Sequence, residues 1–130
     1  MPRFRLHLVS IAAAAAALTA NMTFADTGIM TAKTKLGTVL TDAKGMTLYT
    51  YTKDKTGMSA CEGQCAANWP PMIAPAGAKP EDDYTIIKRS DSTMQWAYYG
   101  KPLYHWMNDK APGDTTGEGI GGVWHVAKTQ

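Results

Sequence analysis

An eleven-residue segment of this chain occurs twice, and the repetition constrains the fold more than any other sequence feature. Residues 45–55 align without gaps on residues 100–110, at an offset of 55 positions. Both copies share a leading glycine, a Leu-Tyr pair and a closing Asp-Lys pair, and Tyr51 aligns with Trp106. Self-similarity at a fixed offset indicates two copies of one supersecondary unit. We therefore expect two repeats, at about residues 36–73 and about residues 84–127.

Alternation of side chains around the duplicated segment predicts β-strands. Tyr49 and Tyr51 would face one side of a strand, as would Tyr104 and Trp106 in the second copy. A glycine-bearing turn precedes each copy, which is typical of a hairpin. Strands are expected at 38–41, 48–53, 84–88, 94–98, 103–107 and 123–127. The prediction is a single small all-β domain of two degenerate β-hairpin repeats, a meander of about six to eight strands that closes as a sandwich or an irregular barrel.

The first 25 residues have the organisation of a secretory signal peptide. Two arginines precede an apolar run at residues 8–18 that is dominated by alanine, and small residues precede Ala25. The run is shorter than the roughly 20 residues that a membrane-spanning helix needs. We expect cleavage after Ala25, with Ala20 as the alternative, and a periplasmic or secreted product of residues 26–130. No cysteine lies at either site, so neither a lipid anchor nor a transmembrane segment is expected in the mature chain.

The charge balance argues against nucleic acid as a partner. Removal of the leader takes lysine plus arginine from 13 to 11, against 11 aspartates and glutamates, because the leader holds two arginines and no acid. A mature chain with no net charge gives no electrostatic reason to expect a polyanion as a partner. An unknown envelope protein or a small ligand remains as the expected partner.

Two cysteines, Cys61 and Cys65, predict one short disulfide. An even cysteine count in an exported chain favours a disulfide, and a domain of this size gains from such a staple. The alternative is a redox or metal-binding dithiol, but the spacing differs from that of thioredoxin-like sites. The segment around them, residues 61–68, is expected to form a short helical turn that ends before Pro70.

The duplicated segments resemble a known family, the secreted-repeat lipoproteins of unknown function. That family is marked by the motif Y-x-(F/W/Y)-x-x-D, which residues 49–54 and 104–109 both satisfy. The segment Cys61 to Pro71 and the ending from Pro112 to His125 are also similar to the family pattern. The resemblance covers roughly residues 36–127. It implies no established activity, and the missing lipobox cysteine departs from the lipid-anchored members.

The tyrosine and aspartate of each motif are the first candidates for a site. An aspartate at the end of a strand can accept hydrogen bonds from loop amides and so fix the loop that follows. A tyrosine combines apolar area with one hydroxyl. We expect this architectural role for six motif residues, Tyr49, Tyr51, Asp54, Tyr104, Trp106 and Asp109. The alternative is a calcium site at Asp54 or Asp109, where Asp114 and Glu118 would add oxygens, although the spacing is not that of an EF-hand.

Histidine and methionine provide a second candidate, a copper site. Thioether and imidazole groups are ligands that suit copper. His105 and Met107 would share one face of a strand, and His125 lies in the last predicted strand. Packing is the more common use of methionine, so copper is carried as the less favoured alternative.

Catalysis has the least support. The sequence contains no nucleophile elbow, phosphate-cradling loop or zinc-protease motif. Its many aromatic residues are expected mainly in the core, with a flat sugar- or peptide-binding platform as the alternative. We therefore predict a non-enzymatic structural or interaction module of the cell envelope without a cofactor, and a copper- or, less favoured, calcium-binding periplasmic protein as the alternative.

Overall fold

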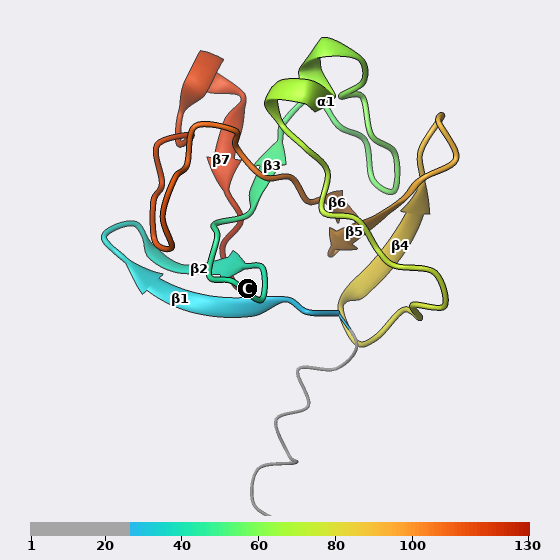
Figure 1. The fold of residues 1–130 in the computed structure, drawn as a ribbon, viewed down its shortest axis with the longest axis horizontal. Helices are drawn as coiled ribbons and strands as arrows, with labels where there is room; N and C mark the ends of the chain where they lie inside the picture. Colours follow the sequence, from blue (N-terminus) through green and yellow to red (C-terminus); the bar gives the residue numbers. More distant parts are fainter. Residues whose placement is uncertain (1–26) are drawn as a thin grey trace, which may run out of the picture.

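Residues 27–130 are described by a computed structural model, and they form an all-β fold (Figure 1). The predicted signal peptide and its cleavage sites lie outside the described residues. The strands pair as β1-β2, β3-β7 and β4-β5-β6. Their bounds are β1 Met30–Thr34, β2 Gly37–Thr41, β3 Tyr49–Tyr51, β4 Tyr84–Lys88, β5 Met94–Tyr98, β6 Lys101–Pro102 and β7 Trp124–Val126. One helix, α1 (Gln64–Asn68), and one 3-10 turn, η2 (Ile120–Gly122), complete the elements. The all-β class, the two repeats and the disulfide are confirmed.

Each repeat begins with the same antiparallel hairpin. In β1-β2, Thr31 lies opposite Leu40, and in β4-β5, Ile86 lies opposite Trp96. The two hairpins lie on opposite sides of the molecule (Figure 1). Strand β1 was not among the predicted strands, because its sequence MTAKT lacks the apolar alternation that marks a half-buried strand.

A ring of three backbone hydrogen bonds closes the first repeat. The Leu40 N–H donates to Ala127 O (2.8 Å), the Ala127 N–H to Leu48 O (2.8 Å), and the Leu48 N–H to Leu40 O (2.9 Å). All three residues are buried. Ala127 belongs to the end of the second repeat, so the first repeat is completed by its neighbour.

The same ring recurs in the second repeat, where Met72, which lies between two isolated bridge residues and not in a strand, completes the ring. The Trp96 N–H donates to Met72 O (2.9 Å), the Met72 N–H to Leu103 O (2.8 Å), and the Leu103 N–H to Trp96 O (3.0 Å). Met72 is the counterpart of Ala127, 55 positions earlier. The last segment of each repeat therefore completes the ring of the other repeat. A simple meander is wrong for the connections between the repeats, because β3 pairs with the distant β7.

The motif segments are shorter as strands than the alternation predicts. The first contributes β3, and the second contributes only Tyr104, in isolated bridges to Tyr49 and Pro71. Both motif segments then make the same turn. In the first, the Asp54 N–H donates to Tyr51 O (3.0 Å), and in the second, the Asp109 N–H donates to Trp106 O (3.1 Å). His105 and Met107 therefore do not share a strand face, since the strand ends before them.

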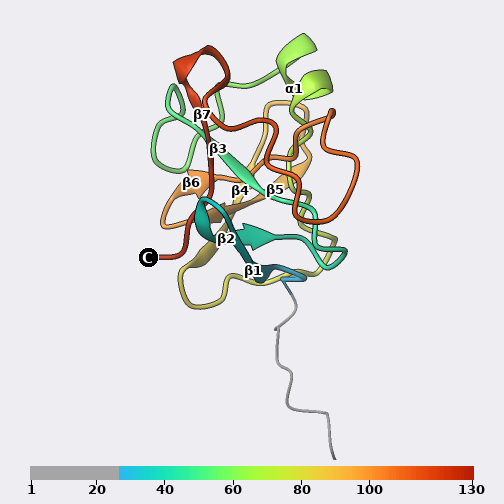
Figure 2. The same cartoon turned by 90° about the vertical axis from the view of Figure 1, so that its left-hand side faces the viewer.

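The disulfide-bearing loop and helix α1 cover one end of the molecule (Figure 2). Cys61 and Cys65 are joined by a disulfide. The helix ends at Asn68, since Pro70 cannot continue it. No helix within residues 27–130 is both long and apolar enough to cross a membrane.

Candidate functional site

The two tyrosine–aspartate motifs meet across the repeat boundary and exchange partners. Tyr49 and Tyr104 lie opposite each other, and each backbone N–H donates to the other's carbonyl, at 2.8 and 3.0 Å. The Tyr49 hydroxyl donates to Asp109 Oδ2 at 2.6 Å, and the Tyr104 hydroxyl donates to Asp54 Oδ2, also at 2.6 Å. Each hydroxyl thus reaches the acid of the other repeat. Both tyrosine side chains are fully buried.

The Tyr49–Asp109 site is closed by the loop that follows the second motif. Asp109 Oδ1 accepts hydrogen bonds from the backbone N–H of Thr116 (3.0 Å) and from its hydroxyl (2.6 Å), and the residue is only 7% exposed. The Gly117 N–H donates to the Tyr49 hydroxyl oxygen at 3.1 Å. A Cβ atom at Gly117 would lie 2.8 Å from the rings of Tyr49 and Trp69. Glycine is therefore required where this loop passes over the rings.

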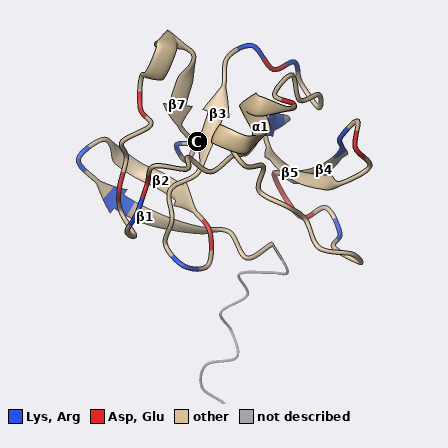
Figure 3. Cartoon of the chain, turned by 45° about the horizontal axis from the view of Figure 1, so that its top comes forward, with Lys and Arg blue, Asp and Glu red and all other residues tan. Residues whose placement is uncertain are grey.

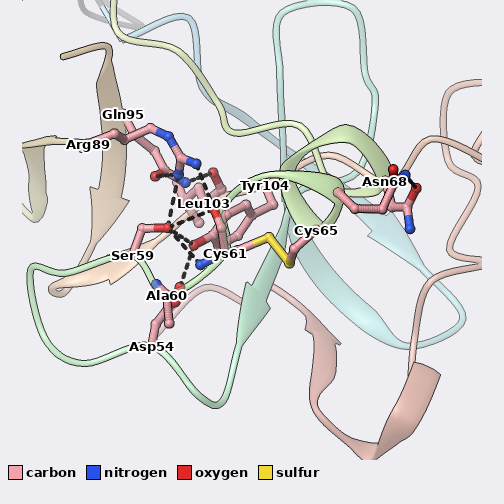
Figure 4. Close-up of a disulfide and its surroundings, with 11 residues drawn as sticks. Asp54, Ser59, Ala60, Cys61, Cys65, Asn68, Arg89, Gln95, Leu103 and Tyr104 are labelled. Atoms are coloured by element: carbon pink, nitrogen blue, oxygen red, sulfur yellow. Dashed lines mark hydrogen bonds between the residues drawn. A yellow bond between two sulfur atoms is a disulfide. The ribbon is translucent and has the colours of Figure 1, made fainter. Parts of the chain in front are cut away.

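The Tyr104–Asp54 site has a cation beside it (Figure 4). Asp54 Oδ1 accepts the N–H of Ala60 at 2.6 Å. Ser59 Oγ lies 2.7 Å from the Tyr104 hydroxyl and accepts a bond from Arg89 at 2.9 Å. Because the Tyr104 proton is directed at Asp54, the serine hydroxyl is the donor to Tyr104.

Arg89 is buried and connects this site to the disulfide loop. Its guanidinium donates to Ser59 Oγ, to Gln95 Oε1 at 2.8 Å and to the carbonyl of Cys61 at 2.6 Å. Gln95 in turn donates to the carbonyl of Leu103 at 2.7 Å. The residue 55 positions earlier is Thr34, so the first repeat offers no equivalent cation.

Burial controls the ionisation of these groups. Desolvation, followed by the hydrogen bond to a carboxylate, raises the pKa of Tyr49 and of Tyr104 well above the ordinary value. Desolvation also raises the pKa of Asp54, although the Ala60 N–H, the Tyr104 hydroxyl and Arg89 act in the opposite direction. Both tyrosines therefore stay protonated, as hydrogen-bond donors, at neutral pH.

Four aromatic rings form one continuous stack across the repeat boundary. Tyr51 stacks on Trp124 (ring centroids 4.2 Å apart), Trp124 on Trp69 (3.9 Å), and Trp69 on Trp106 (4.1 Å). The inner two rings are buried and the outer two are half-buried. Members of the stack are related by the 55-residue offset, Tyr51 to Trp106 and Trp69 to Trp124.

The two buried tyrosines contact this stack edge-on. Tyr49 packs against Trp69 with centroids 5.3 Å apart, and Tyr104 packs against Trp124 at 5.1 Å. Each inner tryptophan is thus adjacent to one hydroxyl that is bonded to a carboxylate. Stacked and edge-to-face pairs at these distances stabilise a core beyond the area they bury.

A groove lies beside the aromatic core. Two contiguous cavities, of about 450 and 190 Å³, share Thr50, Thr52 and Lys101 in their walls. Lys128 and His125 line the larger cavity, which also includes the last residues of the chain, and the smaller one is lined by residues 54–56 and 100–102. The volume of the larger cavity is that of a small-ligand site.

The acids of the groove are already bonded, whereas its lysines are not. Glu118 Oε2 accepts the Val126 N–H at 3.2 Å and lies 3.3 Å from Nδ1 of His125. The three lysines of the groove, Lys55, Lys101 and Lys128, form no ion pair with any described residue. Elsewhere, charges of both signs alternate along the surface loops (Figure 3).

The predicted copper ligands lie apart in different environments. His105 Nε2 lies 3.0 Å from Asp42 Oδ2, and Met107 is 49% exposed in the turn that follows. His125 faces Glu118 in the groove. Within residues 27–130 no group of three or more histidine, cysteine, aspartate or glutamate side chains is placed to hold a metal ion.

The acids proposed for calcium also accept hydrogen bonds from different parts of the chain. Asp114 Oδ2 accepts the backbone N–H groups of Lys110 (2.8 Å) and Ala111 (3.0 Å), and Asp109 and Glu118 have the partners described above.

Several residues of the site were not among the predicted ones. Arg89, Ser59, Gln95 and Gly117 become neighbours of the motifs only through tertiary contacts. Trp69 and Trp124 were detectable, because both are tryptophan and they are separated by the same 55 positions as the motifs.

Comparison with known proteins identifies one family. No curated protein and no solved structure matches the chain. A family described as a secreted repeat of unknown function matches it twice, over residues 30–72 and 85–128, which together make up more than half of the sequence. Each match begins in the first strand of a hairpin and ends at or next to the residue that completes the ring of the other repeat, Met72 or Ala127. The chain belongs to this family of secreted repeats of unknown function.

Proposed function

We propose that the protein is a non-enzymatic interaction module of the cell envelope, which binds an acidic oligosaccharide in the groove beside β3. One observation carries this proposal: the groove has three lysines without an acidic partner among the described residues, while its own acids accept hydrogen bonds from neighbouring groups. Such an arrangement offers three cationic donors to a ligand, and the two side-chain carboxylates of the groove, Asp54 and Glu118, already have donors of their own.

The motif residues are occupied in holding the fold together, which favours a binding surface outside the motifs. Tyr49, Tyr104 and Asp109 are buried, and their polar groups are bonded to each other or to nearby loops. A ligand could reach them only after the core opened. The groove, in contrast, has hydroxyl groups at Thr50 and Thr52, which suit the hydroxyl groups of a sugar.

A titration followed by NMR tests the proposal. The mature protein is titrated with an oligomer of a uronic acid, and with the neutral oligomer of the corresponding hexose as control. We expect amide shifts at Thr50, Thr52 and Lys101 with the acidic oligomer only, weakening as salt is added. Loss of two exposed charge contacts in the Lys101→Gln, Lys128→Gln variant should weaken binding by about tenfold.

Lys88→Gln is the matched control, because Lys88 is an exposed strand lysine outside the groove. It should leave the affinity unchanged. Equal losses in the two variants, or shifts spread over the whole surface, would show that binding is a non-specific charge effect and would contradict the proposal.

A further inference from the structure

The aromatic stack places rings in direct contact from the surface to the two buried tyrosines, and each of these tyrosines has a carboxylate at its hydroxyl. We propose that the protein takes up one-electron oxidising equivalents at Trp106 and stores them as neutral phenoxyl radicals on the buried tyrosines Tyr49 and Tyr104. This activity is separate from ligand binding in the groove.

A route for the electron is continuous from the surface to both tyrosines. Trp106 is half-buried, and its ring stacks on Trp69, which touches Tyr49 edge-on. Trp69 also stacks on Trp124, which touches Tyr104. No ring along this route is separated from the next by more than 5.3 Å between centroids. Since electron transfer slows steeply with distance, direct ring contacts favour fast steps.

A route for the proton exists at each buried tyrosine. An oxidised phenol is a very strong acid, and a buried positive charge is costly unless it is neutralised. The Tyr49 hydroxyl is 2.6 Å from Asp109 Oδ2, and the Tyr104 hydroxyl is 2.6 Å from Asp54 Oδ2. Each carboxylate can therefore accept the proton as the electron leaves.

The steps balance in electrons and atoms. Trp106 gives one electron to a soluble high-potential oxidant, an oxygen-centred radical such as a peroxyl radical, and becomes a radical cation. Trp69 then gives an electron to Trp106. Tyr49 then gives an electron to Trp69 while its O–H bond breaks and the proton forms an O–H bond on Asp109. The products are the reduced oxidant, a neutral phenoxyl radical and a neutral carboxylic acid. One electron from a soluble reductant, with return of the same proton, restores the starting state.

The two ends of the stack differ, and this gives the proposal a matched control. Tyr51 occupies the position 55 residues before Trp106, at the opposite half-buried end. An oxidised tyrosine at the surface loses its proton to water and holds the oxidation there. An indole radical cation is a much weaker acid than an oxidised phenol and loses its proton more slowly, so it can take an electron from the next ring first. Trp106 is therefore the productive end.

The test uses a bulky oxidant that cannot enter the core. A ruthenium tris-bipyridine complex is oxidised by a light flash with persulfate, and the mature protein is freeze-quenched for electron paramagnetic resonance. We expect a phenoxyl signal that falls strongly in the Tyr49→Phe, Tyr104→Phe double variant, while the part carried by surface tyrosines such as Tyr99, which is 46% exposed, remains. Trp106→Phe should remove most of the part that the double variant loses, whereas Tyr51→Phe should leave that part unchanged.

Further variants separate the route from folding. Trp96→Phe replaces a buried tryptophan outside the stack and should leave the phenoxyl signal unchanged. Asp109→Asn should remove the Tyr49 part of the signal in a Tyr104→Phe background, because an amide is a poor acceptor for the phenol proton. Unfolding by urea checks that each variant is folded.

The proposal is overturned if Trp106→Phe and Tyr51→Phe reduce the phenoxyl signal equally. It is also overturned if the double tyrosine variant keeps the full signal of the unchanged protein, which would place the radical on other tyrosines, or if no phenoxyl radical forms while Trp106 itself is oxidised.

Discussion

The Tyr49–Asp109 and Tyr104–Asp54 sites are built from the same motif but stabilised in different ways. The first buries its carboxylate almost completely and satisfies it with the hydroxyl of Tyr49 and two groups of Thr116. The second leaves its carboxylate half-buried and places Arg89 and the disulfide loop beside it. The crossed pair is thus the common element, while the loops after each motif have diverged.

This difference shows which parts of a repeat are interchangeable. The tyrosine hydroxyl to aspartate distance is 2.6 Å in both sites, so the geometry of the cross does not depend on the surrounding charge. At the Tyr104–Asp54 site, Arg89 takes the place of the deeper burial and the additional Thr116 donor that stabilise Asp109 in the other site. Substitutions that affect one site and not the other can test this interpretation.

The largest effect is expected for Arg89→Met. Methionine keeps much of the apolar volume but leaves Ser59, Gln95 and the Cys61 carbonyl without their donor. We expect the free energy of unfolding to fall by about 4 kcal/mol, since buried groups that lose their partners cost about 1–3 kcal/mol each. Urea unfolding measures this loss, and the exposed neighbour variant Lys88→Met should change it by less than about 0.5 kcal/mol. A small effect of Arg89→Met would mean that the cation is dispensable.

The next largest difference is expected between the two aspartates. Asp109→Ala leaves three donors unpaired in a buried site, and Asp54→Ala leaves two in a half-buried one. We expect losses of about 3 and about 1.5 kcal/mol. Measurements should use the same denaturant and temperature. The reverse order would show that proximity to Arg89 matters more than burial.

A double-mutant cycle tests the exchange of hydrogen-bond partners between the two motifs. Tyr49→Phe combined with Asp109→Asn should show a coupling free energy of about 1–2 kcal/mol, because the two groups share one hydrogen bond. Tyr49→Phe combined with Asp54→Asn should couple by less than about 0.5 kcal/mol. Strong coupling within a motif, rather than between motifs, would be incompatible with the observed exchange of partners.

A smaller effect is expected from pH. Because the pKa of Asp54 is raised in the folded state, its contribution to stability is present below the ordinary value of 3.8 and is lost as pH rises through the folded pKa. The backbone N–H groups of Lys110 and Ala111 lower the pKa of Asp114, so its contribution is present above 3.8 and is lost as pH falls through the folded pKa.

Unfolding free energies of Asp54→Asn and Asp114→Asn should therefore diverge in opposite directions from the wild type across the acidic range. Parallel curves for the two variants would contradict the environments described for these carboxylates.

The smallest effect is expected from added metal. A ligand that binds only the native state raises the melting temperature. His105 and His125 each face a different carboxylate, so we expect no rise with Ca²⁺ or Cu(I) in thermal unfolding. A rise with Cu(I) that disappears in the His105→Ala, Met107→Ala variant would instead support the copper alternative.

The local elements were predictable because their signals are local. Alternation predicted β2, β4, β5 and β7, and the proline after Trp69 predicted the end of α1. The even cysteine count in a chain expected to be exported predicted the disulfide. Strand β1 was missed because most residues of its sequence, MTAKT, are polar. Its strand conformation depends on pairing with β2. The second motif ends as a strand at Tyr104 because its partners there are Tyr49 and Pro71, which no local pattern specifies.

The sequence by itself determined that the chain consists of two equivalent units with an aromatic segment and a terminal acid in each. It contained no signal for the pairing of Tyr49 with Asp109 and of Tyr104 with Asp54 across the units. That choice, like the position of Arg89 and the stacking of Trp69 on Trp124, was made by tertiary structure. The physical reason is that the ring of backbone hydrogen bonds in each repeat is completed only by a residue from the end of the other repeat, Ala127 in the first and Met72 in the second.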